Sequence, residues 1–281
     1  MREVSCTDIT AAVAWLCAQA ACDLPADVES AVRGACDAEE SPHGRWALEK
    51  ICDNIDVART DGVPLCQDTG LALVHVRLGQ DVHVVGGTLR EAVDAGVARG
   101  YAEGLLRMST VRDPVFDRTN TGDNTPAILD IELVEGDALD IDLMPKGAGS
   151  ENMSRLGMLT PADGADGVRR FVVDAVTDAG GKPCPPTIVG VGIGLNAEGA
   201  MRLSKKALAR EVGTPNADER YAVLEADILA ELNASGIGPQ GFGGRVTSLA
   251  VHIEAAPTHI AMLPVAVTLN CHAARRAHVR L

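Results

Sequence analysis

Three of the eight cysteines stand in segments that combine a thiol with glycine, proline or ionisable neighbours. They are Cys66 in residues 64–70, Cys184 in residues 182–186 and Cys271 in residues 269–276. Each is expected at the junction of a loop with a helix or strand, where several thiolates can be directed at one point. Spacing alone leaves two interpretations open, a shared metal site or three isolated thiols.

The remaining cysteines lie in alanine-rich sequence with helical spacing, and free cysteine of this kind packs as a small apolar residue. They are Cys6, Cys17, Cys22, Cys36 and Cys52. The chain has no Cys-x-x-Cys pair, which disfavours zinc-ribbon and thioredoxin interpretations. A cytosolic chain of 281 residues also does not need disulfides to fold.

The elements that must position the three cysteines follow from hydrophobic periodicity. Helices are predicted for residues 7–21, 26–36, 46–57, 89–106, 164–179, 197–211 and 217–234. Strands are predicted for residues 71–78, 82–85, 127–134, 138–143, 186–193, 246–254 and 260–269. The first four strands pair as two hairpins around turn signals. Without a regular βαβ rhythm, the pattern favours an α+β fold of mixed sheets and hairpins packed with helices.

No repeat, low-complexity tract or long linker interrupts the chain, so one domain over residues 1–281 is expected, helical over about the first 60. A net charge of −14 argues against nucleic-acid binding, which needs clustered Lys and Arg, but it does not exclude an anionic substrate. Apolar runs fall short of the roughly 20 residues that cross a bilayer. We therefore expect a cytoplasmic protein that binds neither nucleic acid nor membrane.

Six motifs follow one another in a specific order, and the match that they mark covers roughly residue 45 to the C-terminus. They are Cys66–Gly70, Asn120–Ala127, Lys146–Asn152, Cys184–Pro186, Gly190–Gly194 and Cys271–Ala273. This succession resembles the large (alpha) subunit, or N-terminal catalytic domain, of the family of class I (iron–sulfur) fumarate hydratases and L(+)-tartrate dehydratases. No single motif carries the resemblance, but their ordered combination is specific.

The resemblance implies a [4Fe–4S] cluster held by Cys66, Cys184 and Cys271, with the fourth iron lacking a protein ligand. An open iron acts as a Lewis acid on a substrate hydroxyl and carboxylate, whereas a cluster with four cysteine ligands suits electron transfer. The missing fourth ligand therefore points to catalysis. The exposed iron also predicts sensitivity to oxidation.

The resemblance also assigns residues beside the cluster. Asp68 is expected in proton transfer, and the alternative is an Asx-turn residue that stabilises the loop before Gly70. Gln67 would orient a substrate carboxylate, or only satisfy loop backbone. Arg107 would bind a substrate carboxylate through its forked donors, the alternative being a solvated residue at a helix end.

Gly149 is the third residue expected to bind substrate, because the turn at residues 146–149 offers main-chain N–H groups to an anion. His259 matches an active-site histidine of the family, although a lone histidine before a strand is more often structural. Arg275 and Arg276 follow Cys271 and would add positive potential or bind a partner. The run at residues 190–194 lacks the third glycine of a dinucleotide fingerprint, so it predicts close backbone packing.

The expected function is therefore the reversible hydration of fumarate to (S)-malate by a cluster-bearing alpha subunit. Because single-chain family members continue into a second domain, a separate beta subunit in an α2β2 heterotetramer is expected. L(+)-tartrate is the alternative substrate, and mesaconate stays open because one methyl group gives little discrimination. Alternatives from other classes are a non-catalytic iron–sulfur redox or sensor protein and a zinc or thiol-only structural protein.

Overall fold

The computed structural model describes residues 1–281, which divide into two compact units. Unit 1 comprises Met1–Pro25, Ile55–Ala148 and Arg275–Leu281, and unit 2 comprises Ala26–Asn54 and Gly149–Ala274. Each unit has its own sheet and its own hydrophobic core. Each unit is assembled from separate segments, so no linker in the sequence marks the boundaries, and the expectation of one domain stays a prediction.

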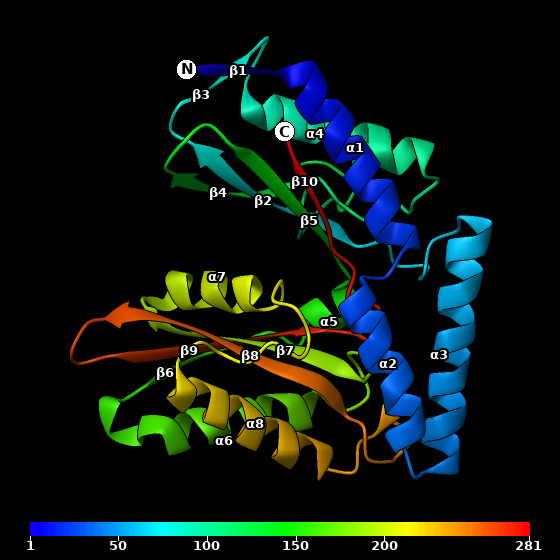
Figure 1. Ribbon diagram of the computed structural model, residues 1–281, viewed down its shortest axis with the longest axis vertical. Coiled ribbons are helices and arrows are strands. Elements are labelled where there is room, and N and C mark those ends of the chain that lie inside the picture. Colours follow the sequence, from blue (N-terminus) through cyan, green and yellow to red (C-terminus); the bar gives the residue numbers. More distant parts are fainter. The chain divides into compact units, whose positions relative to one another are not determined.

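Unit 1 is built on a four-stranded sheet with strand order β10-β5-β2-β4. The strands are β2 (Leu71–Gly79), β4 (Ile128–Val134), β5 (Leu139–Lys146) and β10 (Ala277–Arg280). Helices α1 (Cys6–Cys22) and α4 (Leu89–Glu103) cover one face of the sheet (Figure 1). A separate parallel pair joins β1 (Arg2–Ser5) to β3 (Val82–Val85).

The two predicted hairpins of unit 1 do not form. Strand β2 pairs with β5 and β4 rather than with β3, and β2 lies between β4 and β5. Both predicted turns are present, but they bond to each other: Asp81 N donates to Gly136 O and Gly79 N donates to Ala138 O. Local turn residues therefore indicate where a strand ends, whereas strand partners are set by long-range packing.

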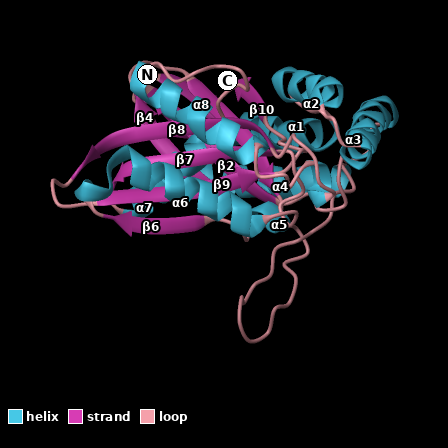
Figure 2. Cartoon of the chain, turned by 90° about the horizontal axis from the view of Figure 1, so that it is seen from below, coloured by secondary structure: helices cyan, strands magenta, loops and turns pink.

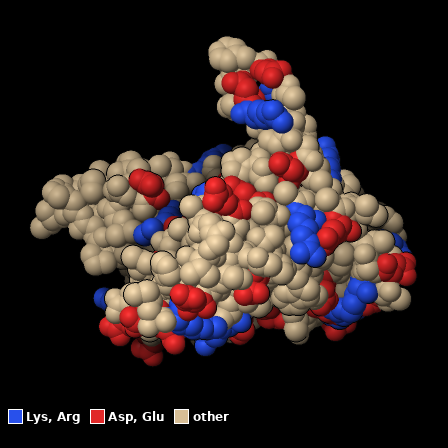
Figure 3. Space-filling view, turned by 90° about the horizontal axis from the view of Figure 1, so that it is seen from above, with Lys and Arg blue, Asp and Glu red and all other residues tan.

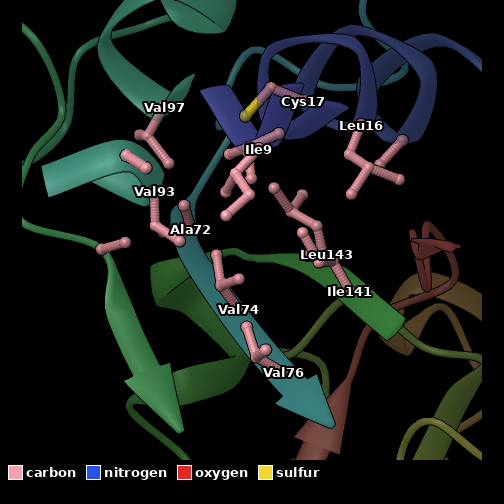
Figure 4. Packing of buried hydrophobic residues seen from close by; sticks show 14 of the residues in the cluster. Ile9, Leu16, Cys17, Ala72, Val74, Val76, Val93, Val97, Ile141 and Leu143 are labelled. Atoms are coloured by element: carbon pink, nitrogen blue, oxygen red, sulfur yellow. The ribbon is translucent and has the colours of Figure 1, made fainter. Parts of the chain in front are cut away.

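The core of unit 1 lies between α1, α4 and the sheet. Figure 4 shows Ile9, Leu16 and Cys17 of α1 above Val74 and Ile141 of the sheet, and all five are buried. The stretch Cys6–Ala38 is long and apolar enough in composition to resemble a membrane span. It is, however, two helices, and the apolar face of α1 packs inside the core.

Unit 2 is a three-layer structure around a sheet with strand order β6-β9-β7-β8. The strands are β6 (Arg155–Leu159), β7 (Thr187–Leu195), β8 (Ser248–Thr258) and β9 (Leu263–Asn270). Helix α7 (Ala197–Ala207) covers one face, and α6 (Gly164–Ala179) and α8 (Glu219–Asn233) cover the other (Figure 1). Helix α2 (Ala26–Ala38) and the unit 2 part of α3 (Pro42–Asp61) complete it, while α5 (Ala148–Glu151) is a single turn.

The glycines of β7 confirm the prediction of close backbone packing. A Cβ atom on Gly190 would lie 2.2 Å from the carbonyl oxygen of Ser204, and one on Gly192 would lie 2.0 Å from that of Ala200. Both acceptors belong to α7, so only glycine lets this helix lie directly on the strand. The run therefore has a packing role in the sheet that carries two of the three cysteines.

Residues 104–127 of unit 1 form the longest segment without a helix or named strand, seen as the projecting loop in Figure 2. The helix predicted to Leu106 ends at Glu103. Phe116 and Val115 are exposed on this segment. On the face shown in Figure 3, basic side chains are interspersed with acidic ones and form no broad basic patch.

Candidate functional site

Cys66 lies in the loop between α3 and β2, within unit 1. The loop is attached to α1 because Leu65 N donates a 2.9 Å hydrogen bond to Ala21 O. Cys66 is half-buried, and its Sγ atom lies 3.5 Å from Oε1 of Gln67. The exposed Gln67 amide thus stands beside the thiol.

Asp68 is the best-fixed ionisable group of this loop. Its Oδ1 accepts a hydrogen bond from Gly70 N at 3.0 Å, which is the Asx-turn contact, and its Oδ2 accepts one from Ala148 N at 2.9 Å. The Nη2 group of Arg275 donates to the main-chain oxygen of Asp68 at 2.9 Å. A carboxylate oxygen has more than one lone pair, so each can accept a further proton or hydrogen bond.

Gly70 and Tyr101 fix the backbone that follows Asp68. Gly70 has φ +79°, and a Cβ atom there would lie 2.7 Å from the carbonyl carbon of Lys146, so both conformation and space require glycine. The Tyr101 hydroxyl lies 2.9 Å from the carbonyl oxygens of Thr69 and Gly70. Burial raises the pKa of Tyr101, so this hydroxyl stays protonated and able to donate.

Arg107 is connected to the same loop through its main chain. The Oγ1 atom of Thr69 donates a 3.1 Å hydrogen bond to the carbonyl oxygen of Arg107. The guanidinium itself is exposed, and no hydrogen bond or ion pair within the chain engages it. Unit 1 therefore brings together Cys66, Gln67, Asp68 and Arg107.

Cys184 and Cys271 lie together at one end of the unit 2 sheet. Cys184 precedes β7, Cys271 follows β9, and these two strands are antiparallel neighbours. His272 N donates to the carbonyl oxygen of Cys184 at 3.2 Å, joining the two loops. Cys184 is exposed and has φ +57°, a left-handed conformation that costs a non-glycine residue energy and often marks functional sites.

Gln240, which the sequence analysis did not single out, also joins the two cysteine loops. Its Nε2 group donates to Pro185 O at 2.6 Å and lies 3.1 Å from Nδ1 of His272. Its main-chain N–H donates to the same Pro185 carbonyl at 2.8 Å. The only sequence signal was the concentration of glycines in residues 236–244 around it.

Gly149 lies close to the Cys184 loop in unit 2. A Cβ atom on Gly149 would be 3.4 Å from the carbonyl oxygen of Lys182, two residues before Cys184. Next to it, Glu151 forms an ion pair with Lys205 of α7. Unit 2 therefore brings together Gly149, Cys184 and Cys271.

His259 is not brought to this end of the sheet. It follows β8 in the turn that leads into β9, beyond the end of β7, so the nine residues of β7 separate it from Cys184 by roughly 25 Å. The side chain is exposed, and its Nδ1 accepts a hydrogen bond from Ala261 N at 3.1 Å. It borders an apolar cavity of about 410 Å³ with Ile193, Tyr221 and Met262 among its lining residues.

The other cysteines differ from Cys66, Cys184 and Cys271 in setting, because each lies within a helix. Burial raises the pKa of Cys17 to about 12. Burial, with Cys52 at 3.5 Å between the two Sγ atoms, raises that of Cys36 to about 12. Since thiolates are the metal-binding form, these two thiols are poor ligands. Inside either unit, no three His, Cys, Asp or Glu side chains converge on a metal position.

Comparison with known proteins identifies the class. The family model described as fumarate hydratase (fumerase) matches residues 10–280. The chain therefore belongs to the fumarate hydratase family. Members of this family are hydro-lyases, which are enzymes that add or remove water.

Individual relatives cover nearly the whole chain. A putative L(+)-tartrate dehydratase subunit alpha of Methanocaldococcus jannaschii is 41% identical over 97% of each chain. The L(+)-tartrate dehydratase subunit alpha of Escherichia coli strain UTI89 is 32% identical, covering 100% of this chain and 93% of the relative. The same subunit of E. coli strain K12 is 32% identical, with coverages of 98% and 91%.

Proposed function

We propose that this chain is the cluster-bearing subunit of a [4Fe–4S]-dependent hydro-lyase that hydrates fumarate reversibly to (S)-malate. The observation that carries the proposal is the fixed carboxylate of Asp68, two residues after Cys66, in a chain of the fumarate hydratase family. A proton-transfer group next to a proposed ligand is what a hydro-lyase needs and an electron carrier does not.

The donor set fits an iron–sulfur cluster. Cys66, Cys184 and Cys271 would hold it, and all three lie in loops rather than within helices. None of the three is buried, and the Cys184 and Cys271 loops already share a hydrogen bond. When bound, the cluster would supply a Lewis-acidic iron with no protein ligand.

The residues of unit 1 supply binding and proton transfer. Arg107 offers an unpaired, forked donor to one carboxylate of a dicarboxylate. Gln67 would orient that substrate through its amide, and Gly149 of unit 2 would offer its main-chain N–H. Asp68 exchanges a proton with the substrate or with water while Gly70 N and Ala148 N hold its carboxylate in one orientation. His259 stays an active-site candidate on resemblance alone.

A separate beta subunit is part of the proposal, because the relatives in the comparison are named as alpha subunits. We propose that it completes the substrate site in a heterotetramer located in the cytoplasm. Full hydratase activity of this chain alone, purified with an intact cluster, would contradict the need for a partner.

L(+)-tartrate is the second candidate substrate, and the names of the relatives favour it. It is also a four-carbon dicarboxylate, so Arg107 and Asp68 would serve it in the same way. Tartrate differs from malate by one additional hydroxyl group.

The test is anaerobic reconstitution of the chain with its beta subunit, followed by assays with fumarate, malate, L(+)-tartrate and mesaconate. Saturable interconversion of fumarate and malate, with substrate-dependent changes in the EPR spectrum, is the expected result. Turnover of tartrate alone would replace the substrate assignment. A cluster that neither turns over any of these acids nor responds to them spectroscopically would reject the hydro-lyase proposal in favour of a redox or sensor protein.

A further inference from the structure

Arg275 combines deep burial with unused hydrogen-bond donors. It is the largest fully buried side chain of the protein, with a relative exposure of 2%. Its Nη2 group donates to the carbonyl oxygen of Asp68, while Nε and Nη1 are buried and have no hydrogen-bond partner. A guanidinium stays charged at any physiological pH, so a buried positive charge is present here with donors to spare.

No carboxylate of the chain neutralises this charge by a direct contact. Asp68 is the nearby acid, but its two oxygens accept hydrogen bonds from Gly70 N and Ala148 N, and Arg275 contacts only its main-chain oxygen. An unpaired buried charge is strongly unfavourable, whereas pairing with an anion that also accepts hydrogen bonds removes most of that cost. The arrangement therefore calls for a bound anion.

The chain itself indicates which anion this is. Arg275 lies four residues after Cys271. The carbonyl oxygen that accepts its hydrogen bond belongs to Asp68, two residues after Cys66. Its free donors are thus close along the chain to two proposed cluster ligands. Three thiolates give a [4Fe–4S]²⁺ core a net negative charge, and the sulfur atoms of such a cluster accept hydrogen bonds.

We propose that Arg275 is a cluster-binding residue whose Nε or Nη1 group donates to a sulfide or thiolate sulfur, an inference that rests on the proposed function. Its positive charge and its N–H···S contact stabilise the more negative, reduced form of the cluster. If molecular oxygen or ferricyanide took one electron from a bound [4Fe–4S]²⁺ cluster, one Fe²⁺ would leave and a [3Fe–4S]⁺ cluster would remain. Arg275 raises the potential of that first electron loss and so protects the cluster.

The experiment uses protein labelled with ¹⁵N at arginine, reconstituted anaerobically and oxidised with ferricyanide to the paramagnetic three-iron form. Pulsed EPR should detect a ¹⁵N coupling that disappears in Arg275→Lys and persists in Arg276→Lys, a matched change at the adjacent residue. Arg275→Gln should also lose its fourth iron severalfold faster than wild type. The wild-type coupling can be measured even where a variant fails to fold.

The outcomes separate the two proposals. A wild-type protein that takes up no cluster rejects the proposed function and this inference with it. A cluster that forms normally but shows no arginine coupling, or a coupling that survives in Arg275→Lys, rejects only the role of Arg275. In that case the guanidinium of Arg275 donates a hydrogen bond to the Asp68 carbonyl and has no contact with the cluster.

Discussion

The main-chain N–H of Ala148 donates a 2.9 Å hydrogen bond to the carboxylate of Asp68, a contact between residues 80 positions apart. It ties the turn that follows β5 to the loop of Cys66. Gly147 makes the approach possible, since a Cβ atom there would lie 3.3 Å from Oδ2 of Asp68. The orientation of this carboxylate is therefore set by backbone on both sides rather than by mobile side chains.

Replacing Asp68 by Asn should reduce kcat by about 10²–10⁴-fold, because the amide keeps the shape but cannot carry the proton. Cluster content, measured as bound iron and sulfide, should stay near wild type. Asp53→Asn, which removes only an exposed contact with Lys50, is the matched control. Wild-type turnover in Asp68→Asn would remove this residue from the mechanism.

Replacing Gln240 by Ala removes the side-chain bond to Pro185 O and the contact with His272 that link the Cys184 and Cys271 loops. The free energy of unfolding should fall by about 1 kcal/mol, and the cluster should be lost faster to an iron chelator. Gln80→Ala, at an exposed turn of unit 1, should change neither quantity. Equal rates of cluster loss in both variants would show that Gln240 does not hold the ligand loops.

Replacing Gly192 by Ala places a methyl group against the Ala200 carbonyl of α7. Pushing the helix from the sheet should lower the free energy of unfolding by at least about 1–3 kcal/mol, as measured by urea denaturation. Gly34→Ala in α2 is the control, because nothing lies within 4 Å of its added Cβ. That change should be neutral or slightly stabilising. A neutral Gly192→Ala would contradict the close packing of α7.

The hydrogen bond from Arg280, together with the charge of Arg77, lowers the pKa of Asp140 in the folded protein. A lowered folded pKa means that the contribution of Asp140 to stability is complete above its unfolded pKa of about 4 and is lost as pH falls through the folded value. Urea denaturation should therefore show wild type more stable than Asp140→Asn at pH 7, with the difference shrinking below about pH 4. Asp137→Asn, at an exposed position of the same unit, is the matched control variant.

Residue patterns were sufficient to predict the structural features that depend on local sequence, such as the positions of helices. Helical spacing located the N-terminal helices, and the glycines in Gly190–Gly194 predicted close backbone packing, which the contact with α7 confirms. Strand partners were missed because β2 and β5 meet across more than 60 residues, and a turn does not specify the partner of a strand.

Motifs that concentrate reactive residues, as at Cys66–Gly70, could be located from the sequence, and the roles assigned to these residues stay predictions. The contacts of Gln240 with Pro185 and His272 were not predictable. Arg275 was expected to add positive potential after Cys271, but its burial and its contact with the Asp68 carbonyl were not predictable, because both depend on distant parts of the chain. The position of His259, at the far end of its sheet from Cys184, likewise follows from strand direction.

We propose that Cys66, Cys184 and Cys271 together hold one cluster. The most direct measurement is iron and sulfide content, with the absorbance and EPR spectra, of wild type and single Cys→Ser variants reconstituted anaerobically. About four irons per chain are expected in wild type and in Cys36→Ser, whose thiol lies in a helix. Each variant at the three loop positions should lose the intact cluster. A complete cluster in any of those three, or its loss in Cys36→Ser, would contradict the account.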